Sequence, residues 1–170
     1  MIIWFIGLSG SGKTTIGKAL HDKLKPTHPN LIFIDGDEFR KVMGNDLGHS
    51  LEDRQKNAPR FSHFCRWLDQ QGIHLVCCVL SNFPEWQKWN RENFRQYFEI
   101  SLDVPMKILK KRDVKNLYER ALNGETDNVV GVDIPYIPPE SPDMLIENSG
   151  DLAAVDSLVE DILENLPEFE

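Results

Sequence analysis

The fold and the chemistry of this chain are decided by the stretch Gly7-Leu8-Ser9-Gly10-Ser11-Gly12-Lys13-Thr14. The stretch follows an apolar run at 2–6, which predicts a strand, and it opens the segment 13–24, whose apolar residues recur at helical spacing. Glycines at these positions let the backbone curl, so that successive N–H groups point at one phosphate. The N-terminus of the helix adds a partial positive charge. This context predicts a nucleotide-phosphate site, the P-loop.

The side chains of this loop have separate expected roles. Lys13 supplies a mobile cation for the β- and γ-phosphate oxygens of ATP, and the Thr14 hydroxyl is placed to ligate Mg²⁺. No Asn-Lys-x-Asp sequence, which would recognise guanine, occurs in the chain, and this favours ATP over GTP. The other residues of the segment that we expect to bind ATP are Gly7, Ser9, Gly10, Ser11, Gly12 and Thr15.

Strand-like and helical segments alternate along the rest of the chain. Further strands are expected at 31–34, 73–80, 97–102 and 144–146. Helices are expected at about 51–71, 84–96, 105–112 and 151–166, the last capped by Asp151. Strands that are apolar on both faces and alternate with helices indicate a parallel sheet. We therefore expect an α/β fold, a P-loop NTPase three-layer sandwich whose five-stranded parallel sheet carries helices on both faces.

Length and composition limit the remaining possibilities. The 170 residues suit a single domain, 1–170, without repeats, and the proline-rich stretch 124–142 is expected to be an ordered loop. A formal net charge of −8 without a run of Lys or Arg argues against nucleic-acid and membrane-surface binding. The three cysteines, Cys65, Cys77 and Cys78, have no metal-ligand spacing and suit core packing. Free thiols and the shortness of the apolar run at 2–6 favour a cytoplasmic location without an anchor.

The second strand is followed by Asp35-Gly36-Asp37-x-x-Arg40. Ligands of open parallel sheets bind beyond the carboxyl ends of the strands, so both aspartates should face the γ-phosphate and its metal ion. One carboxylate can order a metal-bound water and accept the proton of an attacking hydroxyl. We assign both roles to Asp35, although the pattern leaves Asp37 open as the base. An ordinary Asp-Gly turn with solvated carboxylates is the alternative.

The next motif makes a resemblance specific. It reads Asp46-Leu47-Gly48-His49-Ser50-Leu51-Glu52-Asp53-Arg54-Gln55-Lys56-Asn57. Together with the P-loop and the aspartate motif, it resembles the adenylylsulfate kinase family, whose members carry GLSGSGKTT, DGDxxR and DLGFSxEDRxxN. Two later stretches resemble the family's RDxKxLY and GxDxPYxPPE motifs, and they read Arg112-Asp113-Val114-Lys115-Asn116-Leu117-Tyr118 and Gly131-Val132-Asp133-Ile134-Pro135-Tyr136-Ile137-Pro138-Pro139-Glu140. The resemblance spans nearly the whole chain.

The resemblance implies ATP-dependent phosphorylation of the ribose 3′-hydroxyl of a small nucleotide, by a homodimer. It implies that Arg112 contacts ATP and that 112–128 is a lid. The guanidinium groups of Arg40 and Arg54 suit a phosphate-bearing acceptor. Surface salt bridges are the alternative role for these two arginines. The positions that it assigns to acceptor binding are Asp37, Arg40, His49, Arg54, Asn57, Ser81, Lys115 and Val129.

Several positions depart from the family pattern. His49 and Val129 stand where the family has two phenylalanines that enclose the substrate's adenine. The family's SP(F/Y)R segment reads Ser81-Asn82-Phe83-Pro84-Glu85-Trp86, which lacks the arginine, and its paired arginines read Pro59-Arg60. At two further positions where the family has basic residues, this chain has Leu122 and Asp127. A stacking partner is worth about 1–3 kcal/mol, so these losses predict a changed acceptor.

The leading acceptor is a cytidine nucleotide such as CDP-phosphoramidate, on which adenylylsulfate-kinase-like enzymes act in the modification of bacterial surface polysaccharides. Adenylylsulfate itself is the alternative. An aromatic group, Trp86, Trp89 and Phe94, serves core or dimer packing, or else one of its rings replaces a lost phenylalanine. A sugar or metabolite kinase would not need the 46–57 motif. A catalytically silent nucleotide-binding regulator would not need intact Lys13 and Asp35.

Overall fold

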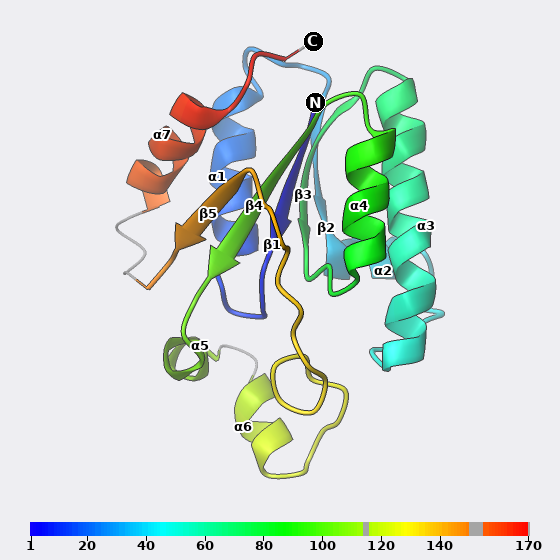
Figure 1. Ribbon diagram of the computed structural model, residues 1–170, viewed down its shortest axis with the longest axis vertical. Coiled ribbons are helices and arrows are strands. Elements are labelled where there is room, and N and C mark those ends of the chain that lie inside the picture. Colours follow the sequence, from blue (N-terminus) through cyan, green and yellow to red (C-terminus); the bar gives the residue numbers. More distant parts are fainter. Residues whose placement is uncertain (114–115, 150–154, 170) are drawn as a thin grey trace.

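The computed structural model of the chain describes residues 1–113, 116–149 and 155–169. Its centre is a five-stranded parallel sheet in the order β2-β3-β1-β4-β5, which confirms the predicted fold (Figure 1). The carboxyl ends of all five strands therefore meet at one edge of the sheet, the lower one in Figure 1. The strands are β1 (Ile2–Ile6), β2 (Leu31–Asp35), β3 (His74–Val79), β4 (Tyr97–Asp103) and β5 (Met144–Glu147).

Helices cover both faces of the sheet. One face carries α1 (Lys13–Leu24) and α7 (Val155–Asn165), and the other carries α3 (Leu51–Gln70) and α4 (Pro84–Asn93). Three short helices lie toward the carboxyl edge: α2 (Gly36–Val42), α5 (Met106–Arg112) and α6 (Leu117–Leu122). Among the described helices, none has the length and apolar character needed to cross a membrane.

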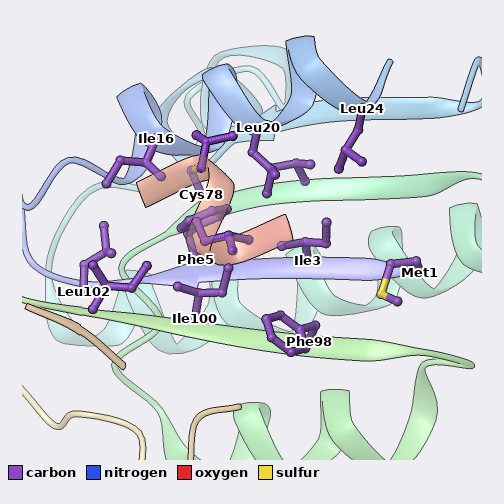
Figure 2. Close-up of a cluster of buried hydrophobic side chains, with 14 of the residues drawn as sticks. Met1, Ile3, Phe5, Ile16, Leu20, Leu24, Cys78, Phe98, Ile100 and Leu102 are labelled. Atoms are coloured by element: carbon purple, nitrogen blue, oxygen red, sulfur yellow. The ribbon is translucent and has the colours of Figure 1, made fainter. Parts of the chain in front are cut away.

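The alternating side chains of β1 divide the core into two clusters. Ile3 and Phe5 face α1 and α7, where they pack with Ile16, Leu20 and other apolar residues (Figure 2). Ile2, Trp4 and Ile6 face the opposite way and pack against Phe61 and Cys65 of α3. Burial of each large apolar side chain contributes about 1.5–3 kcal/mol, so β1 is held rigidly from both sides. This rigidity fixes the loop that follows it.

The three cysteines belong to this core, as predicted. All are buried free thiols, and the Sγ atoms of Cys65 and Cys77 lie 3.8 Å apart. Burial raises the pKa of the Cys77 and Cys78 thiols well above the ordinary value, so both remain neutral. Neutral buried thiols pack as small apolar side chains.

Two of the short helices were not expected from the sequence. Helix α2 begins at Gly36, a poor helix former, because the carboxylate of Asp35 accepts a hydrogen bond from the Asp37 N–H at 2.9 Å and caps it. Helix α6 follows Asn116 in a left-handed conformation, and the Asp113 carboxylate accepts hydrogen bonds from the N–H groups of its first turn. The predicted cap of the last helix, Asp151, lies outside the described residues.

The proline-rich stretch is an ordered loop, as expected. Its regular structure is limited to an isolated bridge between Val130 and Ile134 within the described part. The carboxylate of Asp133 accepts hydrogen bonds from the N–H groups of Asn128 and Val129. Burial would raise the pKa of Asp133, but these N–H groups hold it below the ordinary value. Local hydrogen bonds thus replace the sheet and helix bonds that prolines exclude.

Candidate active site

The phosphate-binding loop is shaped by glycine and held by a distant asparagine. Gly10 and Gly12 have φ values of 77° and 101°, which favour glycine. A Cβ on Gly12 would lie 2.5 Å from the Nδ2 atom of Asn148, which donates a hydrogen bond to the Ser11 carbonyl at 2.8 Å. Asn148 follows β5, and the sequence analysis did not identify it, because one asparagine after a short strand carries no motif.

Lys13 lies over this loop at the start of α1. Its Nζ atom donates hydrogen bonds to the carbonyls of Gly7 and Leu8, at 2.7 and 2.8 Å. The ammonium group is therefore held beside the backbone that would surround a phosphate. Thr14 and Thr15 follow on the first turn and are exposed.

Thr14 and Asp35 come together at the carboxyl edge. The Thr14 hydroxyl donates a hydrogen bond to Asp35 Oδ2 at 2.7 Å, while Asp35 Oδ1 caps α2. A hydroxyl and a carboxylate are hard oxygen ligands, which suit Mg²⁺ when phosphates and water complete its shell. The described residues contain no group of three or more His, Cys, Asp or Glu that could hold a metal. The Thr14 hydroxyl and the Asp35 carboxylate fit a metal ion whose other ligands come from the phosphates of the nucleotide and from water.

Helices α5 and α6 close the other side of the loop. Tyr118 of α6 is 1% exposed, and its hydroxyl donates a hydrogen bond to the Ser9 carbonyl at 2.8 Å. Burial and the charge of Asp113 raise the pKa of Tyr118 to about 12, so it stays a donor. At the end of α5, Arg112 lies against the loop, because a Cβ on Gly10 would be 4.0 Å from the Arg112 Cβ. Its predicted companion, Lys115, lies outside the described residues.

A pocket opens beside the Thr14–Asp35 pair, between the ends of β2 and β3 and helices α2, α3 and α4. Its lining includes six of the residues that the sequence analysis assigned to the acceptor, from three separate segments of the chain: Asp37, Arg40, His49, Arg54, Asn57 and Ser81. Residues far apart in the chain are therefore brought to one cavity, which we call the acceptor pocket.

The two arginines of the acceptor pocket are half-buried. Arg40 donates hydrogen bonds to the carbonyls of Leu47 and Gly48, and Arg54 donates to the carbonyls of His49 and Asn128. Burial lowers the pKa of Arg40, and burial followed by the charge of Arg40 lowers the pKa of Arg54. Neither arginine is engaged in a surface salt bridge within the described residues. Two desolvated cations that repel one another are stabilised by an anion between them.

Aromatic rings form the deeper wall of the acceptor pocket. Phe61, Phe83 and Trp86 line it, whereas Trp89 and Phe94 pack with Trp4 in the core. The rings of Trp86 and Trp89 each contact His63, with centroids 5.6 and 4.8 Å away. Of the three aromatic residues singled out in the sequence, Trp86 alone lines the acceptor pocket.

Val129 belongs to an apolar cluster and does not line the acceptor pocket. It is 3% exposed and packs with Val104, Leu109 and Tyr118 in a cluster next to α5 and α6. It is absent from the lining of the acceptor pocket. Burial of an aliphatic side chain in this apolar cluster accounts for its position, and the contact between Val129 and the acceptor stays a prediction.

The sequence analysis assigned no role to Asn82 and did not foresee the partner of Arg60. Asn82 lines the acceptor pocket and binds the backbone of the proline-rich loop. Arg60, which stands in place of a family arginine, makes a bidentate salt bridge with Asp46 at 2.7 and 2.9 Å. The guanidinium of Arg60 is therefore paired with Asp46 and does not line the acceptor pocket. Neither pairing could be inferred from sequence spacing.

The chain resembles known proteins along most of its length. The model of the family described as adenylylsulphate kinase matches residues 1–147. A cytidine diphosphoramidate kinase from Campylobacter jejuni is 46% identical over 151 residues, which cover 87% of this chain and 86% of the relative. An adenylyl-sulfate kinase from Halothermothrix orenii is 34% identical over 166 residues, which cover 98% of this chain and 89% of the relative.

A solved structure agrees with these matches. The Mycobacterium tuberculosis APS kinase CysC, in complex with AMPPNP and APS, superimposes with a TM-score of 0.86 and is 30% identical. The superposition covers 96% of this chain and 95% of that one. The overall fold is thus shared with an enzyme whose structure was solved in complex with AMPPNP and APS.

Proposed function

Because the chain belongs to the adenylylsulphate kinase family, we propose that it transfers the γ-phosphate of ATP to the ribose 3′-hydroxyl of a cytidine nucleotide such as cytidine diphosphoramidate. The observation that carries this proposal is the acceptor pocket, which keeps Arg40, Arg54 and Asn57 but lacks an aromatic side chain from position 129. The 46% identity to a cytidine diphosphoramidate kinase supports the same acceptor.

On the donor side, the P-loop backbone binds the phosphates of ATP and Lys13 opposes the charge that develops on the transferred group. Thr14 and Asp35 would hold Mg²⁺, which neutralises phosphate charge when it is bound. The carboxylate of Asp35 accepts the proton of the 3′-hydroxyl as its oxygen attacks the γ-phosphorus. The bond between that phosphorus and the bridging oxygen breaks, and ADP leaves.

On the acceptor side, the half-buried arginines suit the phosphates of a nucleotide. Arg40 and Arg54 have their pKa values lowered by burial, so an anion between them recovers part of their lost solvation. Asn57 offers an amide for a ribose or phosphate oxygen.

The base of the acceptor could stack against aromatic side chains on one side of the acceptor pocket. Trp86 and Phe83 present rings there, and His49 is exposed at the position where the family has a phenylalanine. A single stacking platform, worth about 1–3 kcal/mol, suits a pyrimidine better than a purine that relies on two. We assign the platform to Trp86.

Adenylylsulfate is the second candidate acceptor. It is favoured by the superposition on the APS kinase of M. tuberculosis and by the relative from H. orenii. The two candidates share the donor site and the ribose chemistry, and they differ in base and tail.

A screen of adenosine and cytidine nucleotides tests the proposal. The protein is incubated with ATP, Mg²⁺ and each acceptor, ADP release is measured, and the position of the new phosphate is mapped by NMR. Acceptor-dependent ADP release with 3′-phosphorylated cytidine diphosphoramidate is the expected result. Release that no nucleotide acceptor stimulates would overturn it and favour a silent nucleotide-binding protein.

A further inference from the structure

Asn82 connects two segments that are far apart in the chain. It lies between β3 and α4, and its side chain is buried, with 4% exposed. The Nδ2 atom donates a hydrogen bond to the Pro135 carbonyl at 2.9 Å, and Oδ1 accepts one from the Ile137 N–H at 2.7 Å. Both halves of the amide are therefore engaged, on either side of Tyr136.

These two hydrogen bonds take the place of a strand pairing. Pro135 has no N–H to donate. The backbone of the loop is therefore attached to Asn82 through the Pro135 carbonyl and the Ile137 N–H. A buried amide that satisfies both groups is stabilising, whereas removal of the amide leaves both without a protein partner. Asn82 thus fixes the backbone at 135–137, and we call this pair of hydrogen bonds the Asn82 clamp.

The clamp lies between two cavities. Asn82, with Ser81 and Phe83, lines the acceptor pocket. Tyr136 lines a second cavity, together with Ser101, Asp103, Pro138 and Glu140. Asn82 therefore links one wall of the acceptor pocket to a segment that lines the second cavity.

The rest of the proline-rich loop is fixed independently of Asn82. Arg54 donates a hydrogen bond to the Asn128 carbonyl on one side, and Arg91 makes a salt bridge with Asp143 at 3.0 Å on the other. Loss of the clamp would release the middle of the loop while both ends stay attached.

We propose that Asn82 is a positioning residue that sets the width of the acceptor pocket and, through it, the choice of base. A rigid wall excludes larger ligands because packed interiors do not deform continuously. Selection between a pyrimidine and a purine acceptor depends on such a wall. The inference rests on the proposed function, which supplies the two acceptors that are compared. Asn82 need not contact the acceptor to act in this way.

The variants Asn82→Ala and Asn82→Asp test the proposal. Alanine removes both hydrogen bonds, whereas aspartate keeps an oxygen that accepts from Ile137 and loses the donor to Pro135. We expect Asn82→Ala to speed amide hydrogen exchange at Ile137 and to raise the acceptor KM about tenfold. The preference for cytidine diphosphoramidate over adenylylsulfate, as a ratio of kcat/KM values, should fall about tenfold, with the ATP KM unchanged. Asn82→Asp should be at least as disruptive, because a buried carboxylate oxygen would then face the Pro135 carbonyl.

Asn30→Ala is the matched control. Asn30 also ties two distant segments, by donating to the Gly72 carbonyl, but at the opposite end of the sheet. Its loss should lower stability without changing the acceptor preference. If Asn82→Ala changed the melting temperature as Asn30→Ala does and left both acceptor KM and preference as in the wild type, Asn82 would be structural only.

The two proposals can fail separately. If the unmodified protein used adenylylsulfate alone, the cytidine assignment would fail. Exchange at Ile137 and the adenylylsulfate KM of Asn82→Ala would still test the clamp. Wild-type exchange at Ile137 in that variant would overturn the inference whichever acceptor is used.

Discussion

The hydroxyl of Thr14 lies 2.7 Å from Asp35 Oδ2 and donates a hydrogen bond to it, which joins the start of α1 to the end of β2. The two residues are 21 positions apart and come together because β1 and β2 both end at the same edge of the sheet. The other oxygen of Asp35 caps α2. One carboxylate thus connects the phosphate-binding loop with the helix that carries Asp37 and Arg40 into the acceptor pocket.

Asp35→Asn should separate these roles. Asparagine retains an oxygen that can cap α2, so the fold should persist, but it cannot accept a proton. We expect kcat to fall about 100-fold or more, with little change in the ATP KM, as measured by steady-state kinetics. If kcat stayed near the wild-type value and only the acceptor KM rose, Asp35 would be a binding group. The parallel variant Asp37→Asn would then be expected to carry the loss of kcat.

Lys13→Ala should abolish turnover while the fold remains intact, because it removes the cation that opposes charge on the transferred phosphoryl group. Lys18→Ala on the exposed face of α1 is the control, since its salt bridge with Asp22, at 3.2 Å, is a surface pair of little energetic value. Activity and far-UV circular dichroism are compared for both. More than a tenth of wild-type activity in Lys13→Ala would contradict the role of the loop.

The segment 112–128 is expected to act as a lid that ATP and acceptor hold closed. In the described part of this segment, α6 is already attached to the P-loop through Tyr118 and Ser9, so ligands that order the loop should also protect α6. Limited trypsin digestion, which has a site at Arg120, should slow when ATP and acceptor are both present. Equal cleavage rates with and without the two ligands would argue against closure.

The positions 49 and 129 should respond differently to phenylalanine. On the sequence alone, Phe at both positions should restore an adenine sandwich and raise kcat/KM for adenylylsulfate. The structure modifies that expectation, because Val129 is buried in the cluster with Tyr118. Val129→Phe should overpack this cluster and destabilise the protein by about 1–3 kcal/mol, measured by urea unfolding.

His49→Phe is then the direct test of a restored platform, since His49 is exposed in the acceptor pocket. We expect it to raise kcat/KM for adenylylsulfate relative to the cytidine compound by about tenfold. A Val129→Phe protein with unchanged stability and improved use of adenylylsulfate would show that position 129 faces the acceptor after all.

The parts of this molecule that the sequence predicted are those governed by local pattern. The five strands and the long helices follow from apolar periodicity, and the phosphate-binding loop follows from its glycines. Helix α2 was missed because Gly36 at its start indicates a turn, whereas the cap from Asp35 decides the conformation. Helix α6 was missed because its six residues are too few to show a period.

Site residues were predicted where a motif carried them and missed where tertiary packing placed them. Arg40, Arg54 and Asn57 belong to motifs and line the acceptor pocket together. Asn82 and Asn148 act through backbone carbonyls more than 50 residues away, and no spacing rule connects such partners. The buried position of Val129 likewise depends on α5 and α6, which the sequence at 129 does not describe.

A competition between the two candidate acceptors tests the central claim most directly. Equimolar cytidine diphosphoramidate and adenylylsulfate are incubated together with the unmodified protein, ATP and Mg²⁺, and the two 3′-phosphorylated products are quantified by mass spectrometry. Their ratio at early times equals the ratio of the kcat/KM values. We expect the cytidine product to dominate by about tenfold or more, in line with one lost stacking platform. Efficient 3′-phosphorylation of adenylylsulfate, with no product from the cytidine compound, would contradict the proposed acceptor and leave the activity of an adenylylsulfate kinase.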